Sequence, residues 1–299
     1  MLKSDGPNPG SALQDDTQNF NETLKALRKP SFFRSSMGLL GDWILIVATL
    51  VLIRIINHPV AYVAGAFLIG VFQQRLGVIG HEAVHHLLSQ NRRLNDFVGN
   101  VFCFWPLGTS VLGYRRFHFM HHKYTNTPND PEWKHTKSGP WNIPTPMRQM
   151  ILYTMKDLSG LSLRDMIVVI RLTYPPTFRS AIGPALLSIL FVLLSVATGN
   201  LWLPLVWYGG LYTSFWAVLR VRIWFEHTGI LNTHRVHFPW LARWLIAPHN
   251  IWVHWEHHKY SSIPYWNLLK VRDITPEEPV LAFSTVLAQF HGKSLGNSR

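Results

Sequence analysis

Apolar residues gather in four long stretches of the chain, over residues 39–56, 60–80, 181–198 and 201–225. A helix of about 20 residues crosses a hydrocarbon core of about 30 Å, so each stretch is long enough to span a membrane. Three residues separate the first two stretches, and two residues separate the last two. Connections this short join antiparallel neighbours. The pattern therefore predicts an all-α integral membrane protein with four transmembrane helices in two hairpins.

The remaining segments are more polar. Residues 1–36 lack the apolar core of a cleavable signal peptide and predict a cytoplasmic N-terminal tail that is partly disordered. Residues 97–112 are apolar but short, and Pro106 interrupts them, so an interfacial or re-entrant segment fits better than a span. No linker divides residues 37–299, and we expect them to form a single membrane domain.

Composition supports a membrane location. The chain is 47% hydrophobic and 15% charged, whereas soluble domains are about 25% charged. A net charge of +12 suits either nucleic acid or an anionic membrane surface. The basic residues flank the apolar stretches and form no nucleic-acid-binding motif, so the membrane is favoured. With Cys103 as its single cysteine, the chain forms neither an intrachain disulfide nor a four-cysteine metal site.

The distribution of basic residues predicts the orientation. The two short turns contain no Lys or Arg, and nearly all basic residues lie in the N-terminal tail, the middle loop and the C-terminal region. The positive-inside rule places these three segments on the cytoplasmic side. We therefore expect a multi-pass protein of a bacterial inner membrane with both termini in the cytoplasm.

Ten of the sixteen histidines fall into four groups. Three groups are short clusters, and the fourth is a single histidine after the last apolar stretch. At about 1.5 Å per residue, the second and fourth stretches carry their histidines just past the cytoplasmic face. All four groups therefore converge in a cytoplasmic helical cap that carries the active site. The ten are His81, His85, His86, His118, His121, His122, His227, His254, His257 and His258.

The spacing within these groups is typical of metal ligands. Residues three or four apart share a helix face, as His81 and His85 do, and as the histidines of each His-x-x-His-His cluster do. Neutral imidazole binds iron, zinc or copper, and ten histidines exceed the needs of one ion and suit two. Asn250, four residues before His254, is a candidate weak or water-mediated ligand. Its neighbour His249 is a candidate to orient a ligand.

Other metal-binding classes explain the pattern less completely. The sequence from His81 to His85 matches the helical zinc-protease motif, but that motif leaves the other two clusters unexplained. Soluble di-iron bundles use repeated Glu-x-x-His pairs, which this sequence lacks. A metal or haem transporter would hold its ligands near the membrane midplane, whereas these histidines are expected at helix ends.

The three clusters resemble the histidine boxes of the membrane fatty acid desaturase and hydroxylase superfamily. They read HEAVHH (81–86), HFMHH (118–122) and HWEHH (254–258), and FEHTG and HNIWVHWEHH are placed as in that family. The resemblance covers about residues 40–270. It implies two iron ions held by nine of the ten histidines, with either His85 or His86 as the ligand of the first box besides His81. It also implies consumption of O₂ and two electrons from an external donor.

The resemblance further implies an oxidoreductase with a lipid or lipid-like substrate, in the first place a fatty acid desaturase acting on an acyl-lipid or acyl-thioester. A hydroxylase or ketolase would use the same boxes. FEHTG and HWEHHKYSSIPYWNL also resemble bacterial desaturase-like proteins of the rhizobitoxine pathway, so a carotenoid or a small amino-acid-derived molecule is the alternative substrate. No fused redox domain is visible, so a ferredoxin, rubredoxin or flavoprotein would supply the electrons. We expect Glu82, Glu226, Glu256 and Asp130 to offset the metal charge or orient imidazoles.

Overall fold

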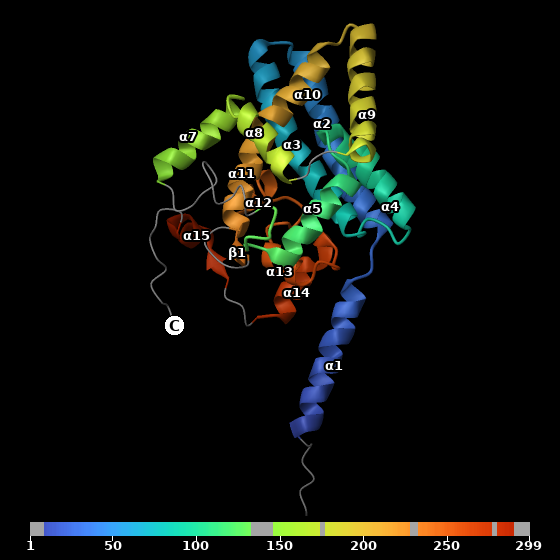
Figure 1. Ribbon diagram of the computed structural model, residues 1–299, viewed down its shortest axis with the longest axis vertical. Helices are drawn as coiled ribbons and strands as arrows, with labels where there is room; N and C mark the ends of the chain where they lie inside the picture. The colour runs from blue at the N-terminus through green and yellow to red at the C-terminus, as the bar shows by residue number, and fades with distance from the viewer. Residues whose placement is uncertain (1–8, 133–145, 174–176, 228–232, 277–279, 290–299) are drawn as a thin grey trace, which may run out of the picture.

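The computed structural model describes residues 9–132, 146–173, 177–227, 233–276 and 280–289. These residues are mostly helical, with long helices at one end of the molecule and, apart from the N-terminal helix, short ones at the other (Figure 1). Among them, three helices are long and apolar enough to cross a membrane. These are α2 (Phe32–Ile56), α3 (Pro59–Val84) and α9 (Phe178–Ala197).

The connection between α2 and α3 is closed by local sequence signals. Asn57 ends α2 in the left-handed conformation, with φ of 45°, and asparagine adopts that conformation more readily than most residues. The main-chain N–H of Val60 donates to His58 Nδ1 at 3.3 Å, which caps the start of α3. Pro59 occupies the first turn, where a helix needs no N–H.

The fourth predicted span differs from the prediction. It forms two helices, α10 (Trp202–Tyr212) and α11 (Ser214–His227), separated at Thr213. The φ and ψ of Thr213 are −124° and −89°, outside the helical region. The sequence pattern shows a continuous apolar stretch because hydropathy alone does not report a break in the backbone.

Side-chain hydrogen bonds explain this break. Thr213 Oγ1 donates to the carbonyl of Gly209 at 2.6 Å, and Ser214 Oγ donates to the carbonyl of Phe67 in α3 at 2.8 Å. Such bonds compete with the helical ladder and bend helices. The break lies where α10 and α11 pass closest to α3, because a Cβ on Gly70 would stand 2.5 Å from the carbonyl oxygen of Gly210.

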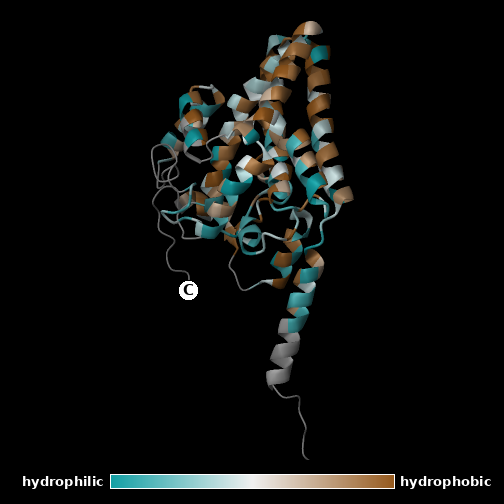
Figure 2. Ribbon diagram, turned by 45° about the vertical axis from the view of Figure 1, so that its right-hand side comes forward, coloured by the Kyte–Doolittle hydropathy of each residue, from teal (hydrophilic) through white to brown (hydrophobic). Residues whose placement is uncertain are grey.

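Apolar side chains cover the outer faces of α2 and α9. Val47, Val51 and Ile55 on α2, and Ile189 and Leu193 on α9, are at least half exposed. Figure 2 shows hydrophobic residues concentrated on these long helices. Large apolar surfaces on a folded chain mark contact with a membrane or with another protein. By contrast α3 is central, and its apolar core residues are packed against α2, α10 and α11.

The N-terminal tail is more ordered than the sequence predicted. Pro9–Leu27 forms α1, which projects from the end of the molecule opposite the α2–α3 turn (Figure 1). Leu24 is buried and Phe20 packs on the same core cluster. The Asn267 side-chain amide donates to the carbonyl of Leu27 at 2.9 Å. These tertiary contacts fix the end of a helix that its polar composition does not predict.

The segment expected at the interface, residues 97–112, contains no span. It includes the end of α4 (Arg92–Gly99), a π-helical turn η1 (Asn100–Phe104) and a 3₁₀ turn η2 (Trp105–Leu107). Pro106 lies in the 3₁₀ turn, where it interrupts no α-helical ladder. The segment packs on α3 and α9 and leads into the helix that carries the second histidine cluster.

Short helices form the end that carries the histidines. A two-residue parallel strand pair, in which Val236 pairs with Leu281 and His237 with Ala282, is a small exception to the predicted all-α fold. The remaining elements are α5 (Val111–Tyr124), α7 (Met147–Leu158), α8 (Leu163–Thr173), β1 (Val236–His237), α12 (Trp240–Leu245), α13 (His254–Lys259), η4 (Tyr265–Asn267), α14 (Leu268–Ile274), β2 (Leu281–Ala282) and α15 (Phe283–Gln289).

Candidate metal centre

Four elements carry the grouped histidines. The last turn of α3 carries His81, and His85 caps that helix. The second cluster lies in α5, whose first turn is capped by Ser110, with Oγ accepting from the N–H of Gly113 at 3.2 Å. The third cluster lies in α13, and His227 is the last residue of α11. All four elements end or lie on the same side of the long helices (Figure 1).

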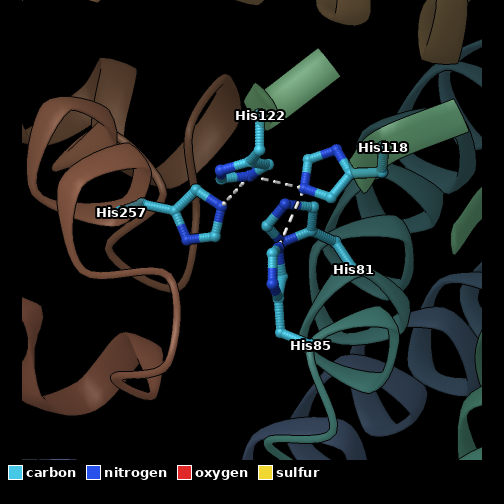
Figure 3. Close-up of side chains that lie close together, drawn as sticks. All are labelled: His81, His85, His118, His122 and His257. Carbon is cyan, nitrogen blue, oxygen red and sulfur yellow. Dashed lines mark hydrogen bonds between the residues drawn. The ribbon is translucent and has the colours of Figure 1, made fainter. Parts of the chain in front are cut away.

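The histidines form two groups, in each of which one nitrogen per residue lies within 4.8 Å of all the others. Figure 3 shows the first group, in which rings from α3, α5 and α13 point toward one another. The five-histidine group is His81, His85, His118, His122 and His257. The four-histidine group is His121, His227, His254 and His258.

The distances within the groups fit shared metal ions. In the five-histidine group, His118 Nε2 lies 2.9 Å from the Nε2 atoms of both His85 and His122. In the four-histidine group, His254 Nε2 lies 2.9 Å from His227 Nε2 and 3.1 Å from His258 Nε2. Imidazole nitrogens about 2.1 Å from one ion lie roughly 3 to 4 Å apart. The donor set of each group therefore fits one ion.

The two groups adjoin each other. The rings of His122 and His258 stack with their centroids 4.2 Å apart. The rings of His121 and His122, neighbours on α5, belong to different groups and lie 6.0 Å apart. Because adjacent residues on α5 and on α13 contribute to both groups, the same two short helices would hold a pair of neighbouring ions.

Burial keeps most of these imidazoles neutral. Desolvation lowers the pKa of His85 to about 3 and the pKa of His122 to about 2. It also lowers the pKa of His118, His257 and His258 well below the usual value, and the neighbouring histidines add to the effect. A neutral imidazole offers the lone pair that a metal needs. The site is therefore ready to bind metal at neutral pH.

Carboxylates lie beside two members of the four-histidine group. Both oxygens of Asp130 lie 3.1 Å from His121 Nδ1, and Glu132 Oε2 lies 3.1 Å from the same atom. Burial opposes protonation of His121, but Glu132 and the hydrogen bond to Asp130 raise its pKa above the usual value. Glu226 Oε2 lies 3.8 Å from His254 Nε2. Asp130 and Glu226 thus lie beside grouped histidines, as the sequence predicted. Glu132 is a third carboxylate beside them, which no spacing in the sequence indicated.

The other two predicted carboxylates, Glu82 and Glu256, bind other parts of the chain rather than a grouped histidine. Glu82 Oε2 accepts from the main-chain N–H of Tyr265 at 3.0 Å, which ties the first cluster to the segment after the third. Glu256 accepts from Arg272 Nε at 2.7 Å and forms an ion pair with Arg235 at 2.8 Å. Both carboxylates fix the positions of histidine-bearing segments from outside the groups.

One of the ten predicted histidine ligands lies outside the two groups. His86, with φ of 61°, lies 3.8 Å from Asp96 and beside Arg115, so His85 is the residue of the first box that joins a group. The Asn250 amide donates to the carbonyl of Tyr265 at 3.1 Å. His249 lies 2.6 Å from an oxygen of Asp42 in α2. In the described contacts, His249 therefore orients no grouped histidine.

A cavity of about 280 Å³ opens beside both groups. Leucines and aromatic residues form much of its wall, and Glu132, Arg222 and Glu226 add charge near the histidines. Ligand cavities are commonly apolar with a few polar groups that fix orientation. The cavity is therefore placed to hold a substrate against the two histidine groups. The grouped histidines that line it are His81, His118, His121, His227 and His254.

Comparisons with known proteins agree with this geometry. The fatty acid desaturase family model matches residues 57–285. The dihydrorhizobitoxine desaturase of Bradyrhizobium elkanii is 26% identical over 302 aligned positions, covering 92% of this chain and 84% of that protein. The sn-1 oleoyl-lipid 12-desaturase of Anabaena variabilis is 24% identical, covering 89% and 82%. An omega-3 fatty acid desaturase of Caenorhabditis elegans is 37% identical over 65 residues, or 22% of this chain and 16% of that protein.

Proposed function

This chain belongs to the fatty acid desaturase family, and we propose that it is an O₂-dependent, di-iron desaturase of the membrane. Family membership makes it an oxidoreductase. The observation that carries the rest of the proposal is the assembly of nine histidines into two adjoining groups at one end of a cavity. Iron suits imidazole donors, and the removal of hydrogen from an unactivated carbon requires a metal or another cofactor.

The proposed ligands follow the two groups. The five-histidine group would hold one iron and the four-histidine group the other, with His85 rather than His86 as the ligand from the first box. Asn250 stays a proposed water-mediated ligand. When bound, the two irons would supply the O₂ chemistry that oxidises the substrate. The chain itself fixes the His121 imidazole through Asp130 and Glu132, and its apolar wall keeps bulk water from the reacting carbons.

The proposed reaction is balanced by an external reductant. Forming one double bond removes two hydrogen atoms from the substrate, and reducing O₂ to two waters takes two further electrons and two protons. A ferredoxin, rubredoxin or flavoprotein would supply the electrons. Two grouped histidines favour such docking, because His122 and His258 do not line the cavity and are partly exposed. Each is followed by an exposed lysine, Lys123 or Lys259, which would attract an acidic carrier.

The proposed membrane layout keeps four crossings. α2, α3 and α9 would each cross alone, and α10 and α11 would complete the fourth crossing together despite the break between them. Residues 37–299 would form one membrane domain, with the tail, both termini and the metal centre on the cytoplasmic side of a bacterial inner membrane. The uneven distribution of basic residues supports this orientation.

An acyl chain, bound as a lipid or a thioester, is the first proposed substrate, as the family name suggests. A small amino-acid-derived molecule is the second, because charged residues line the cavity and because the relative named dihydrorhizobitoxine desaturase aligns over 92% of this chain. Hydroxylation or ketolation, including that of a carotenoid, would use the same groups with a differently placed substrate.

The test is expression in a host membrane, followed by metal analysis of the purified protein and mass spectrometry of lipids and polar metabolites. We expect about two irons per chain and a product lighter than its precursor by two hydrogens. A matched strain carrying His118→Ala and His257→Ala should make no such product. One zinc and no iron, with no change in any metabolite, would overturn the proposed function.

A further inference from the structure

Arg222 lies one turn before Glu226 and His227 on α11, and it lines the same cavity as the grouped histidines. Its Nε stands 3.1 Å from Glu226 Oε2 and 3.0 Å from Oε1. Only 13% of its side chain is exposed. A guanidinium is therefore held next to the metal centre, at the wall of the space where a substrate would bind.

The two terminal nitrogens of Arg222 make no hydrogen bond to any described residue. Arg220 and Arg115 differ, because each also directs a terminal nitrogen to a carboxylate, at 2.9 Å and 2.7 Å. An arginine offers its paired N–H groups as a planar fork that matches a carboxylate. In Arg222 the terminal part of this fork is unused and borders the cavity.

The charge around Arg222 leaves room for an anion. Even with Asp130, Glu132 and Glu226 all ionised, two divalent ions and the guanidinium would give this end of the cavity a positive charge. Burying uncompensated charge is unfavourable, and an anionic ligand group would offset it. A ligand that brought only methylene groups to this position would leave the terminal nitrogens desolvated and unpaired.

We infer that Arg222 is a carboxylate-binding residue, so that the substrate carries a free carboxylate close to the carbons that react. This inference rests on the proposed function and narrows its substrate class. It favours a small carboxylic acid over a lipid or thioester attacked in the middle of a long chain, since such a chain would carry no anion so near the metals. The alternative, that Arg222 only neutralises Glu226, needs Nε alone and leaves the terminal nitrogens without a role.

The experiment is calorimetric binding to the purified, metal-loaded protein in a neutral detergent, with octanoate and octanamide as probes. The two differ in charge and little in shape. Charge-assisted hydrogen bonds predict that octanoate binds about 10- to 100-fold more tightly than octanamide. Equal affinity for the two probes would overturn the inference without any variant being needed.

Variants separate Arg222 from the metals as the source of the preference. Arg222→Met combined with Glu226→Gln removes both charges together and should abolish the preference for octanoate. Arg222→Lys should keep part of it, because the charge remains but the fork is lost. Arg116→Met, at an exposed position on α5, is the matched control and should bind as the wild type does. A preference that survives in the double variant would assign the carboxylate to the metals and overturn the role of Arg222.

Iron content of each sample keeps this test distinct from the test of the proposed function. If the protein holds two irons and forms a double bond but binds the two probes with equal affinity, the proposed desaturase function is supported and the carboxylate site is contradicted. If the protein binds no iron but prefers octanoate strongly, and this preference depends on Arg222, the carboxylate site is supported and the proposed function is contradicted.

Discussion

The direction of single side chains decides whether the metal centre is usable. His121 turns its Nδ1 toward Asp130, 3.1 Å away, so that its other nitrogen is left for the four-histidine group. Carboxylates that hold a ligand imidazole in this way affect metal affinity or activity by about 10- to 100-fold. We therefore expect Asp130 and Glu132 to contribute to metal binding without belonging to either group.

His227 gives the sharpest residue-scale prediction, because it lies outside the three clusters. Its Nε2 stands 2.9 Å from His254 Nε2, and it is 7% exposed. His227→Ala removes one of four donors, so we expect iron content to fall from about two to about one per chain, with loss of activity. Metal analysis of protein purified at normal membrane levels is the measurement.

The control for this substitution is His237→Ala, at an exposed histidine on β1 that belongs to neither group. It should keep both irons and the wild-type rate. Full iron content and full activity in His227→Ala would mean that the four-histidine group is closed by another donor, with Asn250 the first to examine.

Among the elements, α3 does most to place the site. It packs on α2 along one side and on α10 and α11 along another, and its last turn carries His81. A helix surrounded on several sides is fixed in rotation as well as position, because its packed faces interdigitate with their neighbours. The orientation of the first histidine cluster is therefore set by packing that begins several turns away.

Gly70 tests this close packing. A Cβ at Gly70 would stand 2.5 Å from the carbonyl oxygen of Gly210 and closer still to Ser214 Oγ. Gly70→Ala forces the helices apart, so we expect a loss of about 1–3 kcal/mol of stability, seen as earlier thermal unfolding in detergent. Gly41→Ala on α2 is the control, because its added Cβ meets nothing within 4 Å. Equal unfolding temperatures for the two variants would contradict this account of the helix crossing.

Across the whole molecule, apolar surface and metal-binding groups are separated. The exposed apolar side chains of α2 and α9 lie on long helices (Figures 1 and 2), while the grouped histidines lie at the ends of α3 and α11 and within α5 and α13. A membrane around the long helices would leave the centre at its surface, where a carrier protein can approach. The cavity, lined by residues of α3, α10 and α11, would connect that centre with the space between the helices.

The orientation of the whole protein in the membrane gives a further prediction. A reporter fused at Arg299 should be accessible from the cytoplasm, and one inserted at Asn57 should be accessible from the opposite side. A third reporter at Asn200 should behave as the one at Asn57 does, because both mark turns between proposed crossings. Accessibility of the Asn57 and Arg299 reporters from one side would contradict the two-hairpin layout.

Much of this protein follows from local sequence. Apolar length alone located α2, α3 and α9, since a span is defined by consecutive residues. The three- and four-residue spacing of the clusters identified eight residues that the structure gathers, because that spacing fixes which side chains share a helix face, and His227 was identified from its place after the last apolar stretch. Asp130 and Glu226 were also predicted to act near the histidines, and both lie beside members of the four-histidine group.

Tertiary structure alone decided the rest. The division of the histidines into groups of five and four, and the choice of His85 over His86, depend on how α3, α5, α11 and α13 meet. The break at Thr213 depends on the approach of α10 to α3, and the placement of Arg222 and Glu132 at the cavity depends on distant segments. Periodicity specifies the faces of one helix, whereas the partners of each face are set by long-range packing that no local pattern encodes.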